Sequence, residues 1–172
     1  LTSSAIGKLE EKGGFGTSAG GAGDLDGDGV PDLLVGAPGA DSSAGAAYIL
    51  YLNKDGTAKA TSKKIDMGTG TLSAQDYFGG RAIKVLGDVS QDGISDFIVG
   101  AYGADGQGAA WILFMDSEGA VAKKQKISSD GTGGFDKTAV TEDSAQFGHS
   151  IAVLGDVDGD SILDIAISAN QE

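Results

Sequence analysis

The sequence predicts an all-β protein built from a repeated unit of antiparallel strands, and three observations lead to this prediction. Glycine supplies 30 of the 172 residues, more than twice the usual share of about 7%, and no Gly-X-Y period accompanies it. The glycines are therefore expected in turns. Short apolar runs lie between these glycine-rich stretches, and an internal repeat spans the chain.

The repeat consists of three similar segments. They read FGTSAGGAGDLDGDGVPDLLVGAPG from Phe15, FGGRAIKVLGDVSQDGISDFIVGAYG from Phe78 and FGHSIAVLGDVDGDSILDIAISAN from Phe147. The first two are followed by GAAYILYLNKDG and GAAWILFMDSEG, so the similarity extends well beyond one motif. We expect a single domain over 1–172 that is divided into the segments 1–14, 15–77, 78–146 and 147–172.

The first two strands of each unit flank an acidic, glycine-rich turn. Apolar runs at 83–86 and 151–154 precede this turn, and runs at 33–35, 97–99 and 165–167 follow it. No segment carries a convincing helical pattern.

The third and fourth strands follow in the first two units. Residues 47–52 and 110–115 are apolar and aromatic, as expected of a strand that is covered on both faces. A tight turn then leads into weaker, lysine-bearing strands near 63–65 and 123–127. Four antiparallel strands with a polar outermost strand are the pattern of a β-propeller blade.

The repeat accounts for about two and a half blades. Two units are whole, the third stops after its second strand, and residues 5–9 are expected to form the outer strand of a preceding blade. An incomplete ring leaves apolar faces and strand edges open. We therefore expect the remaining blades to come from a longer parent chain or from other subunits, and this chain, which begins at Leu1, to be a processed or excised piece.

Composition excludes several classes of partner. The formal net charge is −13, and Arg81 is the only arginine, so a phosphate-binding surface for nucleic acid is not expected. No apolar run is long enough to insert into a membrane, and the negative charge disfavours an anionic lipid surface. The absence of cysteine removes disulfides, thiolate metal sites and a cysteine nucleophile.

The turns DLDGDGVPD, DVSQDGISD and DVDGDSILD carry the functional signal. Carboxylates at alternate positions of a tight turn converge, and they repel one another unless a cation lies between them. Oxygen-only ligands on a flexible loop favour calcium, with about three ions expected in the chain. The expected ligands are Asp24, Asp26, Asp28, Asp32 and the carbonyl of Val30; Asp88, Ser90, Asp92, Asp96 and the carbonyl of Ile94; and Asp156, Asp158, Asp160, Asp164 and the carbonyl of Ile162.

Two other interpretations of these turns are less favoured. An EF-hand loop needs a glutamate at its twelfth position, but Val35, Val99 and Ile167 stand there. Ordinary Asp-Gly turns with solvated charge would explain one isolated match, whereas three matches at one point of a repeat favour metal. The second turn, in which Ser90 replaces a carboxylate, is the weakest of the three.

The order Phe15-Gly16, acidic turn, Gly36-Ala37-Pro38 resembles the FG-GAP repeat of integrin alpha-subunit β-propellers. The second and third units replace Gly-Ala-Pro by Gly-Ala-Tyr and Ser-Ala-Asn. The resemblance implies one strand before and one after each turn, calcium in the turn, a ring that usually has seven blades, and a role in extracellular adhesion or ligand binding.

Few other side chains are candidates for chemistry. His149 is the only histidine, and no nucleophile, base and orienting group are identifiable together. Tyr77 and Tyr102, in loops, are the better candidates for a ligand surface. Structural roles are expected for a further set, with the aromatic residues packing between blades and the lysines as solvated charges on the outer strands: Tyr48, Tyr51, Trp111, Phe114, Lys63, Lys64, Lys123 and Lys124.

Two functional classes remain open. The favoured one is a non-enzymatic, calcium-stabilised module of an extracellular or cell-surface protein that binds a protein or glycan through its loops. The alternative is the propeller domain of a secreted enzyme of the polysaccharide lyase or phospholipase type, which rests on fold analogy alone.

Overall fold

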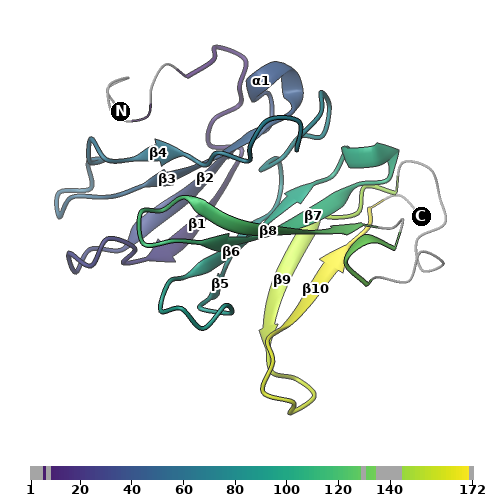
Figure 1. Ribbon diagram of the computed structural model, residues 1–172. Helices are drawn as coiled ribbons and strands as arrows, with labels where there is room; N and C mark the ends of the chain where they lie inside the picture. Colours follow the sequence, from purple (N-terminus) through teal and green to yellow (C-terminus); the bar gives the residue numbers. More distant parts are fainter. Residues whose placement is uncertain (1–5, 7–8, 129–130, 135–144, 171–172) are drawn as a thin grey trace.

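The computed structural model describes residues 6, 9–128, 131–134 and 145–170, and it consists of two four-stranded sheets and a two-stranded hairpin (Figure 1). Neighbouring strands in each sheet are antiparallel and follow one another in chain order. The first sheet comprises β1 (Ser18–Gly23), β2 (Asp32–Ala37), β3 (Ala46–Leu50) and β4 (Lys63–Lys64). The second comprises β5 (Ile83–Gly87), β6 (Asp96–Ala101), β7 (Ala109–Met115) and β8 (Val121–Ser128), and the hairpin comprises β9 (Ser150–Gly155) and β10 (Asp164–Ser168).

These elements confirm the prediction of an all-β fold built from four-stranded units. One strand, β1, has the sequence SAGGAG, which shows no apolar run. The described residues also contain three short helical turns that were not expected: α1 (Ala40–Ser43), η1 (Ala104–Gly106) and η2 (Thr132–Gly134). In the expected outer strand at 5–9, residues 5, 7 and 8 lie outside the described part of the chain, and Ile6 and Leu9 are not in a strand.

The core lies between successive sheets. Its largest cluster joins Leu34 and Ile49 of the first sheet to Val99 and Leu113 of the second. Phe78 and Phe147, the phenylalanines of the second and third Phe-Gly motifs, are buried. Each sheet is therefore stabilised by apolar contact with the next one in the chain.

The Phe-Gly motif is tied to the end of the second strand by the same hydrogen bond in each unit. The backbone N–H groups of Gly16 and Gly79 donate to the carbonyls of Gly36 and Gly100, both at 2.9 Å, and the N–H of Gly148 donates to Ser168 at 3.1 Å. Because only backbone atoms take part, the bond survives the loss of the Gly-Ala-Pro signature in the later units.

Glycine at the second-strand position lets successive sheets approach closely. A Cβ atom on Gly36 would lie 1.9 Å from the carbonyl oxygen of Gly79, and one on Gly100 would lie 2.0 Å from that of Gly148. The first Gly of the Gly-Ala-Pro signature is thus required by the contact with the next unit.

Candidate metal centres

Each acidic turn connects the first and second strands of its unit, and all three lie at the lower end of the sheets in Figure 1, opposite α1. The first aspartate of each turn accepts hydrogen bonds from two backbone N–H groups further along the turn. The donors are Asp28 and Gly29 to Asp24, at 3.0 and 2.8 Å; Asp92 and Gly93 to Asp88, at 2.9 and 2.8 Å; and Gly159 and Ser161 to Asp156, at 2.7 and 3.0 Å.

The first and third turns bring three carboxylates together. One oxygen from each of Asp24, Asp26 and Asp28 lies within 4.8 Å of the others, and the same holds for Asp156, Asp158 and Asp160. All six aspartates are exposed. Oxygen donors of this kind fit a hard divalent cation such as calcium.

The second turn does not form a three-carboxylate cluster, because Ser90 stands between Asp88 and Asp92. The Ser90 hydroxyl lies 3.5 Å from Asp88 Oδ1. Hydrogen bonds from Gly93, Asp92 and other backbone N–H groups lower the pKa of Asp88, while burial opposes that shift. The turn keeps the fold of the others but has one charge less to offer a cation.

The last aspartate of each turn is bound to backbone rather than grouped with the other carboxylates. Asp32 and Asp96 are fully buried. Asp32 accepts hydrogen bonds from the N–H groups of Leu25 and Leu52, at 2.8 and 2.9 Å. The matching bonds run to Asp96 from Val89, Ser90 and Met115, at 3.1, 2.9 and 3.0 Å, and to Asp164 from Val157, at 2.7 Å.

The residues predicted to supply carbonyl ligands occupy equivalent positions in the three turns. The N–H groups of Val30, Ile94 and Ile162 donate to the carboxylate two residues earlier, at 2.8, 2.8 and 2.7 Å. This recurring bond fixes the turn at the residue where the carbonyl contribution is expected.

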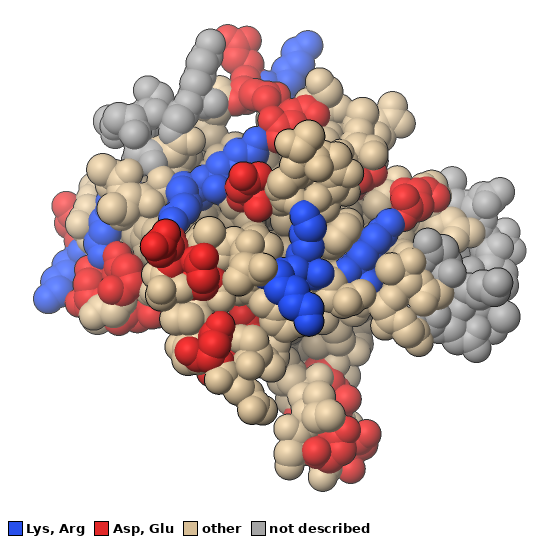
Figure 2. All heavy atoms as spheres, in the orientation of Figure 1, with Lys and Arg blue, Asp and Glu red and all other residues tan. Residues whose placement is uncertain are grey.

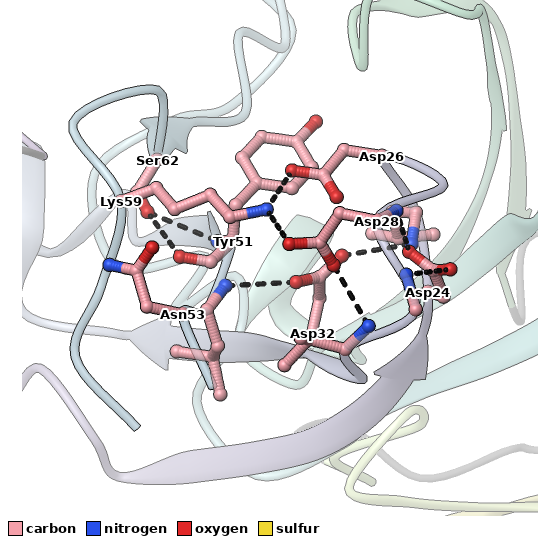
Figure 3. A network of polar contacts seen from close by, with 12 residues as sticks. Asp24, Asp26, Asp28, Asp32, Tyr51, Asn53, Lys59 and Ser62 are labelled. Atoms are coloured by element: carbon pink, nitrogen blue, oxygen red, sulfur yellow. Dashed lines mark hydrogen bonds and ion pairs between the residues drawn. The ribbon is translucent and has the colours of Figure 1, made fainter. Parts of the chain in front are cut away.

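A lysine that the sequence analysis did not single out contacts the first cluster. Lys59 Nζ lies 2.6 Å from Asp26 Oδ2 and 2.6 Å from Asp28 Oδ2 (Figure 3). The hydrogen bonds with Asp26 and Asp28 raise the pKa of Lys59. The bond with Lys59, and then that from Val30, lowers the pKa of Asp28.

The opposite end of the second unit carries an aromatic cluster. Tyr77 and Tyr102 stack with ring centroids 5.0 Å apart, Arg81 lies 5.5 Å from the Tyr102 ring, and His149 meets the edge of that ring at 6.2 Å. Both tyrosines are half-buried. Burial, and secondarily Arg81, lowers the pKa of His149.

The remaining candidates have structural contacts. Tyr48 and Tyr51 are buried in the core, whereas Trp111 and Phe114 are half-buried. Figure 2 shows several groups of basic side chains on one face of the molecule, next to acidic side chains. Lys64 pairs with Asp41, and Lys124 donates to the carbonyl of Met67. These two lysines thus connect an outer strand to a neighbouring segment: Lys64 connects β4 to α1, and Lys124 connects β8 to the chain after β4.

Comparison with known proteins identifies the repeat. The FG-GAP repeat family matches residues 15–50, 85–113 and 147–172. Human integrin alpha-7 is 34% identical over 159 residues, which are 91% of this chain and 12% of that protein. Integrin alpha-PS5 of Drosophila melanogaster is 34% identical over 150 residues, which are 85% of this chain and 14% of that protein.

The chain therefore spans only a small part of the length of these relatives. Within the described residues, no helix is long and apolar enough to cross a lipid bilayer. The matched relatives are integrin alpha subunits, in agreement with the family that the sequence resembles. The repeated Phe-Gly contacts, the acidic turns and these matches together show that the chain belongs to the FG-GAP repeat family, as an integrin alpha-like β-propeller segment.

Proposed function

We propose that the chain is a calcium-binding FG-GAP module of an extracellular or cell-surface protein, with a structural and adhesive role. The observation that supports it is the convergence of three carboxylates in the first turn, repeated in the third. The proposed ligands are those predicted from the sequence, with Asp32, Asp96 and Asp164 also bound to backbone. Calcium would offset the excess negative charge of these turns, and the hydrogen bonds within each turn hold it in shape.

Calcium binding would stabilise the folded chain, because an ion that binds only the folded state shifts the unfolding equilibrium. Calorimetric titration with calcium, together with melting in calcium and in chelator, tests the proposal. Asp28→Ala and Asp160→Ala should each weaken one site, whereas Glu11→Gln removes an equal charge away from the turns. Absence of binding heat, with identical melting in calcium and chelator, would exclude the metal function.

We propose that the ligand is a protein and that it contacts the end of the sheets opposite the acidic turns. The stacked Tyr77–Tyr102 pair and Arg81 support this choice, because tyrosine and arginine are favoured at protein interfaces. Nothing among the described residues favours a glycan. Binding of candidate ligands to the parent protein should fall on Arg81→Ala and Tyr77→Ala, and should persist on Lys84→Ala.

We further propose that the segments 15–77, 78–146 and 147–172 are successive blades and that further blades, from the parent chain or other subunits, cover the hairpin β9–β10. Exposed Leu154, Val157 and Ile162 support this. Size-exclusion chromatography with light scattering should show self-association of the isolated chain; a compact monomer would contradict the proposal.

A further inference from the structure

Lys59 contacts two of the three carboxylates that we propose for the first calcium site. It lies on the hairpin that follows β3, more than 30 residues after the turn. Its side chain is 20% exposed, and its Nζ atom is 2.6 Å from one oxygen of Asp26 and one of Asp28 (Figure 3). The first turn therefore carries a positive charge of its own.

The second unit lacks the lysine and one of the two carboxylates that it contacts. Leu52 pairs with Ala58 in the first unit as Met115 pairs with Val121 in the second, so Lys59 corresponds to Ala122. The turns align in the same way, with Ser90 in the position of Asp26. Asp26 and Lys59 are thus present together in the first unit, and both are replaced in the second.

The two replacements leave the two turns with equal charge. Four aspartates and one lysine give the first turn −3, and three aspartates give the second turn −3. The third turn has four aspartates, and no ion pair reaches Asp156, Asp158 or Asp160 from the described residues. If calcium affinity followed the number of carboxylates alone, the first turn would resemble the third. If it follows the net charge of the turn, the first turn resembles the second.

We propose that Lys59 is a built-in counter-cation of the first acidic turn, which a divalent ion must displace from Asp26 and Asp28. This inference rests on the calcium binding proposed above. It assigns Lys59 the role of setting the affinity of one site: the first turn binds calcium more weakly than its four carboxylates would without the lysine. The lysine also holds the turn together when calcium is absent.

The physical basis is competition between two cations for the same oxygens. A divalent ion gains attraction from carboxylates that are free, and loses part of it where an ammonium group already contacts them. The ion pairs are close to the surface, so each has a modest effect that salt screens. The expected change in affinity is therefore of moderate size and depends on ionic strength.

The test follows the sites separately by nuclear magnetic resonance of the full chain at neutral pH, with calcium chloride as the titrant. The amide signals of Gly27 and Gly29 report on the first turn, Gly93 on the second and Gly159 on the third. Lys59→Met should tighten calcium binding at the first turn by roughly fivefold and leave the third unchanged. The gain should shrink in about 1 M salt.

Lys54→Met is the matched control. Lys54 is exposed on the same hairpin, makes no ion pair within the part of the chain described, and acts on Asp28 only as a distant charge. Lys54→Met therefore removes an equal charge without breaking a contact with the cluster. Its effect on the first turn should be much smaller than that of Lys59→Met. Equal effects of the two variants would overturn the proposal, because they would show only the general influence of net charge.

A second measurement does not depend on calcium. In chelator, Lys59→Met should lower the melting temperature more than Lys54→Met does, because two carboxylates lose their counter-charge. Calcium binding at all three turns without any change on Lys59→Met would overturn this inference and leave the proposed function standing. No calcium-dependent shift at any turn would overturn the proposed function itself, even if Lys59→Met lowers stability in chelator.

Discussion

The carboxylate of Asp32 accepts a hydrogen bond of 2.9 Å from the backbone N–H of Leu52, 20 residues further along the chain. Asp96 accepts the corresponding bond from Met115 at 3.0 Å. Each aspartate also accepts bonds from the beginning of its own turn. In both units, one buried carboxylate thus joins the acidic turn to the chain at the end of the third strand.

Asp96→Ala should destabilise the fold strongly. The substitution leaves three backbone N–H groups without their acceptor, and hydrogen bonds to a buried charge are each worth about 1.5–3 kcal/mol. The free energy of unfolding, measured by urea denaturation in chelator, should fall by about 3 kcal/mol or more. Asp92→Ala, exposed in the same turn, should cost about 1 kcal/mol or less; similar losses for both would contradict a structural role for Asp96.

Gly100→Ala should disrupt the packing of the second sheet against the hairpin β9–β10. The added Cβ would lie 2.0 Å from the carbonyl oxygen of Gly148, a residue whose N–H group is hydrogen-bonded to the carbonyl of Ser168. Overpacking of this kind costs about 3 kcal/mol, measurable as a lower midpoint of denaturation. Gly21→Ala is the control, since its Cβ would meet nothing within 4 Å. Wild-type stability of Gly100→Ala would show that the two sheets can separate without loss.

The sequence predicts most strands because their apolar runs recur at the same distance from the acidic turn in each unit. The strand β1 departs from this, since SAGGAG has neither alternation nor β-branched residues. It pairs with β2 through backbone bonds, and its glycines allow β5 to approach, with Ile83 O only 3.2 Å from a Cβ built on Gly20. Its position in the repeat, rather than its composition, is the signal for this strand.

The candidate site could be predicted in part for a similar reason. Alternate aspartates in a tight turn indicate convergence, and the first and third turns show it. The sequence does not distinguish Asp32 from Asp24, although Asp32 is buried and lies outside the carboxylate cluster, whereas Asp24 is exposed and belongs to it. The contact of Lys59 with the turn depends on how a distant hairpin folds back, so only comparison of Lys59 with Ala122 could have pointed to it.

His149 should titrate below the ordinary histidine range. Burial and then Arg81 lower its pKa from 6.5, and the Tyr102 ring packs against it. Because the folded state disfavours the protonated ring, the stabilisation that this residue contributes is present above about pH 6.5 and is lost as the pH falls through the lowered pKa. Arg81→Gln should raise the pKa of His149 only part of the way, because burial remains.

Titration of the His149 ring signals by nuclear magnetic resonance measures this pKa directly. Lys84→Gln removes the same charge three residues further along the chain and should leave the pKa of His149 nearly unchanged. A wild-type pKa at or above 6.5 would contradict the effect of burial, and an unchanged value in Arg81→Gln would contradict the contribution of Arg81.

Ser90→Asp should tighten calcium binding at the second turn. It restores the fourth carboxylate, and Ala122 offers no ammonium group at the position of Lys59, so the turn gains the charge of the third turn. The Gly93 amide signal should then follow a calcium affinity that is higher by about tenfold, because affinity rises with the number of charged ligands. In chelator the same variant should be less stable, since the added carboxylate repels Asp88 and Asp92.

The double variant Ser90→Asp with Ala122→Lys rebuilds the first turn in the second unit. Its lysine should contact the new carboxylate, restore stability in chelator and return the calcium affinity most of the way to that of the wild type. If the double variant bound calcium as tightly as Ser90→Asp alone, a lysine at this position would not compete with the ion. The pairing of Asp26 with Lys59 would then serve the stability of the turn only, and carboxylate number alone would set the order of affinity among the three sites.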